Sequence, residues 1–310
     1  MKSFGVGMVG TGIMGRRMMA ALQSHARFRV AGLWDPDAER LQQAVALSGG
    51  GHAADSLDAL VGDAGVDLVY IASPPAWHLQ GVQAATAARR ACLCEKPLAH
   101  TVAEAEALRE IVAASGLPFA VHFPFARSAA ANRLVELVRG GELGAIERAT
   151  LRLRFARWPR DWQAAASGWL AGPDEGGFTR EVMSHFVFLA HRLFGEGGIE
   201  DLQVERGPGG TETRVQARLR LDRATVTVDA AVAGEVADDN CFEVFGSRGS
   251  AALSGWSRLE FAGTTSEPAN AAPATLDGVA AMLEGRSDHG LASVDEALAV
   301  VRCVEAMLRR

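Results

Sequence analysis

The opening segment decides the fold of this chain: Phe4-Gly5-Val6-Gly7-Met8-Val9-Gly10-Thr11-Gly12-Ile13-Met14-Gly15. Its apolar first half predicts a buried strand, and the glycine pattern that follows predicts a turn into a helix. In such a turn Gly10 makes the tight bend, Gly12 lets the backbone approach a pyrophosphate, and Gly15 lets helix and strand pack closely. The anion would lie at the helix N-terminus, where free N–H groups favour negative charge. The predicted dinucleotide-binding residues here are Gly10, Thr11, Gly12, Ile13, Met14 and Gly15.

Asp35, at the end of the next apolar run, bears on which dinucleotide binds. A carboxylate there accepts hydrogen bonds from the ribose 2′-hydroxyl and repels a 2′-phosphate, which favours NAD over NADP. Two alternatives stay open. The segment Asp35-Pro36-Asp37 is also typical of a turn that caps a helix. Arg40, one helical turn away, could reach the 2′-phosphate of NADP.

Strand and helix patterns alternate up to about residue 122, which is typical of βαβ units and of a parallel sheet buried on both faces. We therefore predict an α/β fold whose first domain, residues 1–122, is a doubly wound sheet of the Rossmann type. The predicted strands are 4–9, 29–34, 68–72, 92–94 and 119–122, and the predicted helices include 14–22 and 102–114.

The second half follows a period of two, because Leu151, Leu153 and Phe155 alternate with Arg152 and Arg154. One polar face indicates a mixed or antiparallel sheet that is covered on one side only. We predict an α+β substrate-binding and oligomerisation domain over residues 123–310, with a final helix that packs back toward the first domain. Its predicted strands are 150–155, 214–221, 224–232, 241–245 and 251–254, followed by a polar loop at 263–273 and the helix 294–308.

Composition limits the partners and the location of the protein. The 310 residues are 48% hydrophobic and carry a net charge of −6, so we expect no nucleic-acid partner, since such proteins need a basic face. Four irregularly spaced cysteines indicate neither a disulfide framework nor a zinc site, and we expect no metal. No apolar stretch approaches the ~20 residues that span a bilayer. We expect a cytoplasmic protein that does not associate with membranes.

Lysine is rare in this chain, and one of its two lysines lies in a motif. Lysine and arginine total 31, and the only lysines are Lys2 and Lys96, which leaves 29 arginines. Lys96 stands in Glu95-Lys96-Pro97, directly after the predicted strand 92–94. A lysine there can lose its proton, whereas arginine stays protonated. The alternative interpretation is an ordinary exposed lysine in a turn.

A second turn lies at the end of a predicted strand, where open α/β sheets bind their ligands. Its residues Ser73, Pro74 and Pro75 form a stiff loop that keeps the backbone close to the nicotinamide half of a dinucleotide. We expect His78 to begin a helix or to contact the cofactor rather than to donate a proton.

A histidine follows a glycine pair in the second half, in the stretch Glu175–His185. If this stretch is helical, Glu181 and His185 are four residues apart on one helix face. A carboxylate beside an imidazole orients the ring, which suits a general base. The alternative is a histidine buried in the core.

Taken together, these motifs resemble the Gfo/Idh/MocA family of NAD(P)-dependent oxidoreductases, over nearly the whole chain. The resemblance rests on the glycine turn, Glu95-Lys96-Pro97, the Gly-Gly…His stretch, and the segments Gly140–Ile146 and Phe242–Gly249. It implies hydride transfer between a nicotinamide and a CH–OH or carbonyl carbon. By the same resemblance, His185 takes the alcohol proton, Lys96 holds the oxygen and relays the proton, and Glu95 belongs to the cofactor site. It also implies a homodimer or homotetramer formed through the C-terminal sheet.

The chain departs from the family pattern in the region that usually binds sugar hydroxyls. Glu181 replaces the usual Asp as a third catalytic group, Met183 replaces a Gly, Phe188 replaces an Asp, and Pro124-Phe125-Ala126 replaces Asn and Arg. A buried hydroxyl without a partner costs ~1–3 kcal/mol, so we expect a small substrate with few hydroxyls, such as a modified sugar or an apolar carbonyl or imine compound. The candidate substrate contacts are Arg127, Trp158 and Arg180.

Two other functions stay open on the same fold. One is the NADPH-dependent reduction of an imine or a tetrapyrrole-type compound, which the loss of polar groups permits. The other is a nucleotide-sensing protein that has lost catalysis, against which Lys96 and His185 argue.

Overall fold

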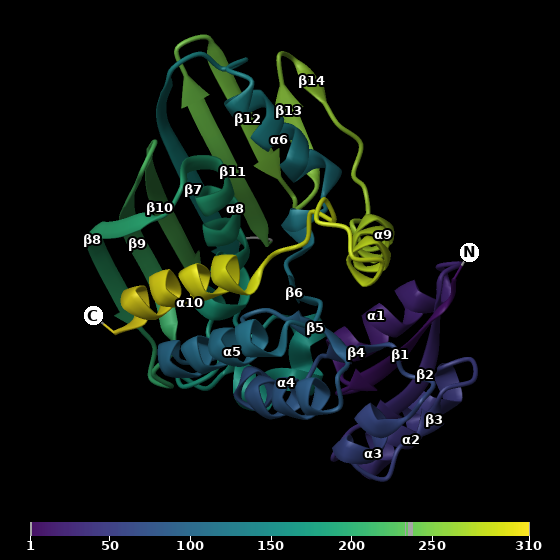
Figure 1. Ribbon diagram of the computed structural model, residues 1–310. Coiled ribbons are helices and arrows are strands. Elements are labelled where there is room, and N and C mark those ends of the chain that lie inside the picture. The colour runs from purple at the N-terminus through teal and green to yellow at the C-terminus, as the bar shows by residue number, and fades with distance from the viewer. Residues whose placement is uncertain (1, 233, 235–237, 310) are drawn as a thin grey trace. The chain divides into compact units, whose positions relative to one another are not determined.

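A computed structural model describes residues 2–232, 234 and 238–309 (Figure 1). The chain forms two compact units, each built from two separate stretches of sequence. The first unit contains Met1–Phe123 and Ala272–Leu298, and the second contains Pro124–Ala271 and Ala299–Arg310. The division into folding domains at residue 122 stays a prediction.

The first unit is built on a six-stranded parallel sheet with the order β3-β2-β1-β4-β5-β6. Its strands are β1 (Phe4–Val9), β2 (Phe28–Trp34), β3 (His52–Ala53), β4 (Leu68–Ile71), β5 (Ala91–Glu95) and β6 (Phe119–His122). Its helices are α1 (Ile13–Gln23), α2 (Ala38–Leu47), α3 (Leu57–Gly62), α4 (His78–Ala87), α5 (Val102–Ser115) and α9 (Ala272–Leu283). The strand order reverses between β1 and β4, and ligands of such sheets bind at this point, beyond the carboxyl ends of the strands. The predicted doubly wound sheet is confirmed.

Short polar residues cap the helices α2 and α5 of this unit. Asp37 accepts the backbone N–H of Arg40 at the start of α2, and Thr101 accepts that of Glu104 at the start of α5. Such caps satisfy N–H groups that have no partner within the helix. The capping role considered for Asp37 is therefore confirmed.

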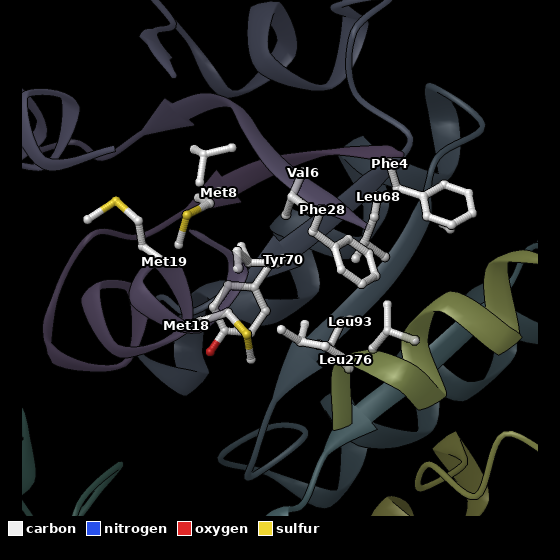
Figure 2. Close-up of a cluster of buried hydrophobic side chains, with 14 of the residues drawn as sticks. Phe4, Val6, Met8, Met18, Met19, Phe28, Leu68, Tyr70, Leu93 and Leu276 are labelled. Carbon is white, nitrogen blue, oxygen red and sulfur yellow. The ribbon is translucent and has the colours of Figure 1, made fainter. Parts of the chain in front are cut away.

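The core of the first unit includes a helix from the far end of the sequence (Figure 2). Phe4, Phe28 and Leu93 of the sheet pack in one cluster with Leu276 of α9. The polar loop predicted for 263–273 is wrong at both ends, because β14 (Thr264–Thr265) lies inside it and α9 begins at Ala272.

The second unit is built on an eight-stranded mixed sheet with the order β14-β13-β12-β11-β7-β10-β9-β8. Strands β7 and β10 are parallel and the other neighbours are antiparallel, so the predicted mixed sheet is confirmed. The strands other than β14 are β7 (Ile146–Phe155), β8 (Gly197–Arg206), β9 (Glu212–Leu221), β10 (Thr225–Val232), β11 (Asp239–Gly246), β12 (Gly249–Ser254) and β13 (Arg258–Phe261). The helices are α6 (Ala129–Arg139), α7 (Ser167–Leu170), α8 (Ser184–Phe194) and the greater part of α10 (Val294–Leu308).

The two faces of this sheet differ as the alternating pattern predicts. Leu151, Leu153 and Phe155 are buried, and helices α6 and α8 lie over one face of the sheet in Figure 1. Arginines of the opposite face form ion pairs with acidic residues of the same sheet. These pairs are Arg152–Asp239, Arg154–Asp229, Arg214–Asp229 and Arg220–Glu200.

Among the described residues, both membrane-spanning helices and clusters of metal ligands are absent. No helix among them has the length and the apolar character that crossing a membrane requires. Nor does the described part of the chain bring three or more His, Cys, Asp or Glu side chains together as ligands for a metal ion.

Candidate active site

The glycine turn after β1 leaves open the space that a pyrophosphate needs. Gly10 has a φ of +88°, and a Cβ there would lie 2.7 Å from the backbone nitrogen of Ser73. A Cβ on Gly12 would meet nothing within 4 Å, and no side chain caps α1 at this residue. The hydroxyl of Ser73 is buried and has no hydrogen-bond partner among the described residues. An uncapped helix N-terminus beside an unused hydroxyl fits a dinucleotide phosphate.

The carboxylate of Asp35 is buried and holds the glycine turn in place. Its Oδ2 accepts the backbone N–H of Thr11 at 2.8 Å and the Thr11 hydroxyl at 2.9 Å. Its Oδ1 accepts the N–H of Asp37 at 3.0 Å and lies 3.7 Å from Nη1 of Arg40. Asp35 therefore lies next to the predicted phosphate site, and a guanidinium stands beside it. The choice between NAD and NADP stays open.

His78 joins the second turn to the segment after Lys96. Its Nε2 lies 2.9 Å from the carbonyl oxygen of Ser73, and its Nδ1 lies 3.2 Å from that of Leu98. The ring is fully buried, and burial lowers the pKa of His78. His78 is the first residue of α4, as predicted. The cofactor contacts of His78, Ser73, Pro74 and Pro75 stay predictions.

Glu95 is the centre of a buried polar network at the end of β5. Its Oε1 accepts the Tyr70 hydroxyl at 2.5 Å and Nδ1–H of His122 at 2.7 Å, and its Oε2 accepts the backbone N–H of Lys96 at 3.3 Å. Burial alone would raise the pKa of Glu95, but His122, Tyr70 and Lys96 together hold this pKa below its usual value. Burial and the Glu95 charge raise the pKa of Tyr70 well above its ordinary value. The network thus keeps a carboxylate ionised beside Lys96.

Lys96 is 8% exposed, so it is not the ordinary exposed lysine of the alternative interpretation. Its backbone is held by Glu95, which is itself tied to strands β4 and β6 through Tyr70 and His122. Lys96 is therefore supported by three neighbouring strands of the sheet.

In the second unit, the stretch that leads to His185 begins with a π-helical turn, Thr179–Met183, in which the N–H of Ser184 reaches the carbonyl of Thr179. Gly177 precedes this turn with a φ of +92°, and a Cβ there would lie 2.5 Å from the carboxylate of Glu212. That buried carboxylate accepts the N–H of Thr179 at 2.6 Å. The predicted helix is present, but a change of helix type separates Glu181 from His185. Turns of this kind are frequent at functional sites.

His185 lies in the first turn of α8, and aromatic rings surround it. The centre of its ring is 6.1 Å from that of Phe125 and 5.4 Å from that of Trp256, and both contacts are edge to face. His185 is buried at 8% exposure. The alternative of a histidine packed among apolar side chains is thus partly correct, and its role as a base stays a prediction.

The three predicted substrate contacts are bound to other parts of the second unit. Arg180 forms a buried two-point ion pair with Glu305, with Nε–Oε1 at 2.6 Å and Nη2–Oε2 at 3.0 Å. The indole N–H of Trp158 donates to the carbonyl of Leu170 at 3.0 Å. Arg127 is half-buried, and its backbone N–H donates to the carbonyl of Pro124. Their contact with a substrate stays a prediction.

Family models match both halves of the chain. Residues 4–123 match an oxidoreductase family with an NAD-binding Rossmann fold, and residues 131–252 match the C-terminal domain of GFO/IDH/MocA proteins. The chain belongs to the Gfo/Idh/MocA family. It is therefore an NAD-binding oxidoreductase, and the resemblance noted in its motifs is confirmed.

Three relatives show how far the similarity in sequence reaches. Inositol 2-dehydrogenase of Mycolicibacterium gilvum is 29% identical over 258 residues, covering 80% of this chain and 70% of the relative. Inositol 2-dehydrogenase 1 of Saccharopolyspora erythraea is 44% identical over 103 residues, covering 32% of this chain and 30% of the relative. D-apiose dehydrogenase of Paraburkholderia graminis is 25% identical over 234 residues, covering 76% of this chain and 56% of the relative. The match spans less than two thirds of the last two relatives.

Solved structures of other proteins share the fold over almost the whole chain. An oxidoreductase from Thermotoga maritima is 18% identical with a TM-score of 0.88, covering 99% of this chain and 96% of the other. An oxidoreductase from Agrobacterium radiobacter, solved with NAD+, L-tartaric acid and magnesium, is 20% identical with a TM-score of 0.86, covering 98% and 95%. At these identities the likeness shows the fold alone.

Three of the residues that depart from the expected pattern of this Gfo/Idh/MocA protein are apolar and buried. Met183, Phe188 and Phe125 are each at most 3% exposed. Apolar side chains therefore fill these three positions, and Phe125 lies against His185.

Sequence reasoning missed several residues of this site. Tyr70 and His122 lie far from Glu95 in sequence, and the one signal that could have pointed to Tyr70 is that the chain has a single tyrosine. In the β5–β6 pairing Glu95 is directly opposite His122, so the strand order, once known, predicts their contact. Nothing in the sequence pointed to Glu212 or Glu305, because their partners depend on the fold of the second unit.

Proposed function

We propose that this protein is a dehydrogenase or reductase that moves a hydride between a nicotinamide and a CH–OH or carbonyl carbon of a small sugar-like ring. The observation that carries the proposal is the buried Lys96, held by an ionised Glu95 in an NAD-binding unit. NAD, when bound, supplies the hydride acceptor for oxidation.

Lys96 and His185 handle the proton in this proposal. The imidazole of His185 accepts the proton of the substrate hydroxyl as general base, and the ammonium of Lys96 holds the substrate oxygen. The rings of Phe125 and Trp256 pack against His185, which is only 8% exposed, so little water reaches it. Glu181 serves as a third polar group at the start of the same helical segment.

The names of the relatives support the substrate class. Two relatives are inositol dehydrogenases and one is a D-apiose dehydrogenase, so myo-inositol and D-apiose are the first substrates to test. The buried Met183 and Phe188 favour a substrate with fewer hydroxyl groups than a free hexose or inositol, so of these two compounds D-apiose should be the better substrate.

The direct test replaces Lys96 by methionine and measures NADH formation with myo-inositol or D-apiose. Loss of the group that holds the reacting oxygen and relays its proton lowers turnover by about 100-fold or more, and NAD affinity should stay unchanged because Lys96 is not needed to hold the phosphates. Lys2→Met is the matched control, since Lys2 is the other lysine of the chain and is exposed. Full activity in Lys96→Met would refute the assignment.

The same assays separate the alternatives. Turnover with NADPH and an imine, without turnover of polyols, would favour the imine or tetrapyrrole-type reductase, for which Arg40 beside Asp35 offers a phosphate contact. Tight nucleotide binding without turnover of any carbonyl, imine or polyol would favour the sensing protein.

A further inference from the structure

Four aromatic rings of the second unit form a ring cluster: Phe125, His185, Phe186 and Trp256. Ring centres are 5.2 Å apart for Phe125–Phe186, 5.5 Å for Phe186–Trp256 and 5.9 Å for Phe125–Trp256. Trp256 is half-buried, whereas the other three are buried. The two phenylalanines of the cluster are therefore its apolar, buried part, and Trp256 is its most exposed member.

The backbone of Trp256 is strained. Gly255 and Trp256 form the centre of the turn between β12 and β13, with φ values of +52° and +71°, and the N–H of Ser257 bonds to the carbonyl of Ser254. Such turns favour glycine or asparagine at both central positions, because a side chain is crowded at positive φ. A tryptophan in the second position works against local stability.

A buried asparagine holds this turn in place. The side-chain Oδ1 of Asn240 accepts the N–H of Trp256 at 3.0 Å, and its backbone carbonyl accepts the N–H of Gly255 at 3.2 Å. Strain of this kind persists only where the surrounding structure enforces it, and it concentrates at functional sites. The fold thus keeps the indole of Trp256 against the ring of His185, although the positive φ of Trp256 destabilises the turn.

We infer that Trp256 is a specificity-determining residue that stacks on an apolar C–H face of the substrate ring. The inference rests on the proposed function, because it takes His185 as the base that touches the substrate. Phe125 and Phe186 offer no hydrogen bonds, so a hydroxyl directed at these two rings rather than at His185 would lose its partners. A substrate ring that presents C–H groups to the indole and carries its hydroxyls at the edge loses no hydrogen bonds.

The test compares Trp256→Gly and Trp256→Phe with the wild type on whichever of myo-inositol and D-apiose the wild type oxidises. Stacking on an aromatic ring is lost in Trp256→Gly, so its KM should rise about tenfold while kcat changes much less. Trp256→Phe should keep KM within about threefold. Ala262→Gly is the matched control, because Ala262 also has a positive φ, +50°, in the next hairpin turn. It should leave KM unchanged.

The outcomes separate the inference from the function on which it rests. An unchanged KM in Trp256→Gly, with an active wild type, overturns the inference alone. If the wild type turns over neither substrate with either cofactor, the proposed function and the inference fail together. If Trp256→Gly does not fold, Trp256→Asn carries the same test, because asparagine tolerates the left-handed turn.

Discussion

Replacing Arg180 by methionine would remove one member of a buried ion pair. The side chains of Arg180 and Glu305 are 9% and 8% exposed, and two hydrogen bonds join them. Arg180 also donates to the carbonyl oxygens of Pro173 and Gly176, at 2.7 Å and 3.1 Å. This side chain therefore joins α10, the loop before the π-helical turn and the turn itself.

The expected loss of stability is large, because Glu305 would stay buried after losing its ion-pair partner. Breaking such a pair from one side costs about 3–5 kcal/mol. A folding unit of this size loses about 2–4 °C in Tm for each kcal/mol, so the second unit should melt roughly 6–20 °C lower. The double variant Arg180→Met/Glu305→Met should recover most of this loss, since apolar residues often replace a buried pair at little cost.

Thermal unfolding followed by circular dichroism measures the effect. Arg157→Met is the matched control, because the ion pair between Arg157 and Asp161 lies on the surface of the same unit, and its loss should cost at most about 1 kcal/mol. An Arg180→Met variant that melts like the wild type but has a raised KM would refute the reasoning. It would instead support the substrate contact predicted from the sequence.

Four further predictions concern pH, the cofactor and assembly. Burial lowers the pKa of His191 to about 4, and no described residue bonds to either ring nitrogen. Because the unfolded chain takes up the proton first, stability should fall by about 3 kcal/mol from pH 6.5 to 4 in urea titrations, and His191→Phe should flatten that slope. His122→Phe should raise the pKa of Glu95. As the pH is lowered, the variant should therefore lose activity at a higher pH than the wild type does. A pH–rate profile with the same acid limb in both proteins contradicts this. Titrations should show tighter binding of NAD than of NADP, and Arg40→Ala should weaken only NADP; a preference for NADP contradicts the role of Asp35. We propose a homodimer or homotetramer formed through the C-terminal sheet, so light scattering should give two or four chain masses, and a monomer would exclude it.

The strands of the first unit could be predicted because their signals are local. The continuous apolar run of β1 and the glycine turn after it lie within twelve residues, and every residue of β1 is buried. Strand β8 was missed for the opposite reason. It lies at an edge of its sheet, and Ile199, Leu202 and Val204 are only half-buried, so no clear alternation marks it.

The site could be predicted only in part. Lys96 stood out because arginine fills almost every other basic position. Its support by Tyr70 and His122 depends on which strands are neighbours, which is a property of the whole sheet. The contact between Trp256 and His185 likewise joins a hairpin turn to a helix about seventy positions earlier, and no local pattern announces it.

The position of α9 constrains the order in which the two units can fold during synthesis. Leu276 and its neighbours complete the core around α1, and Ala292 pairs with Val121 of β6, so the first unit needs residues that leave the ribosome after Pro124–Ala271. At ~5–20 residues per second, that interval lasts on the order of 10 s. During that interval the newly made sheet lacks the part of its core that α9 supplies. A fragment that ends at Phe123 should therefore be prone to aggregation, and the nucleotide-binding unit becomes complete only after Pro124–Ala271 of the second unit has been made.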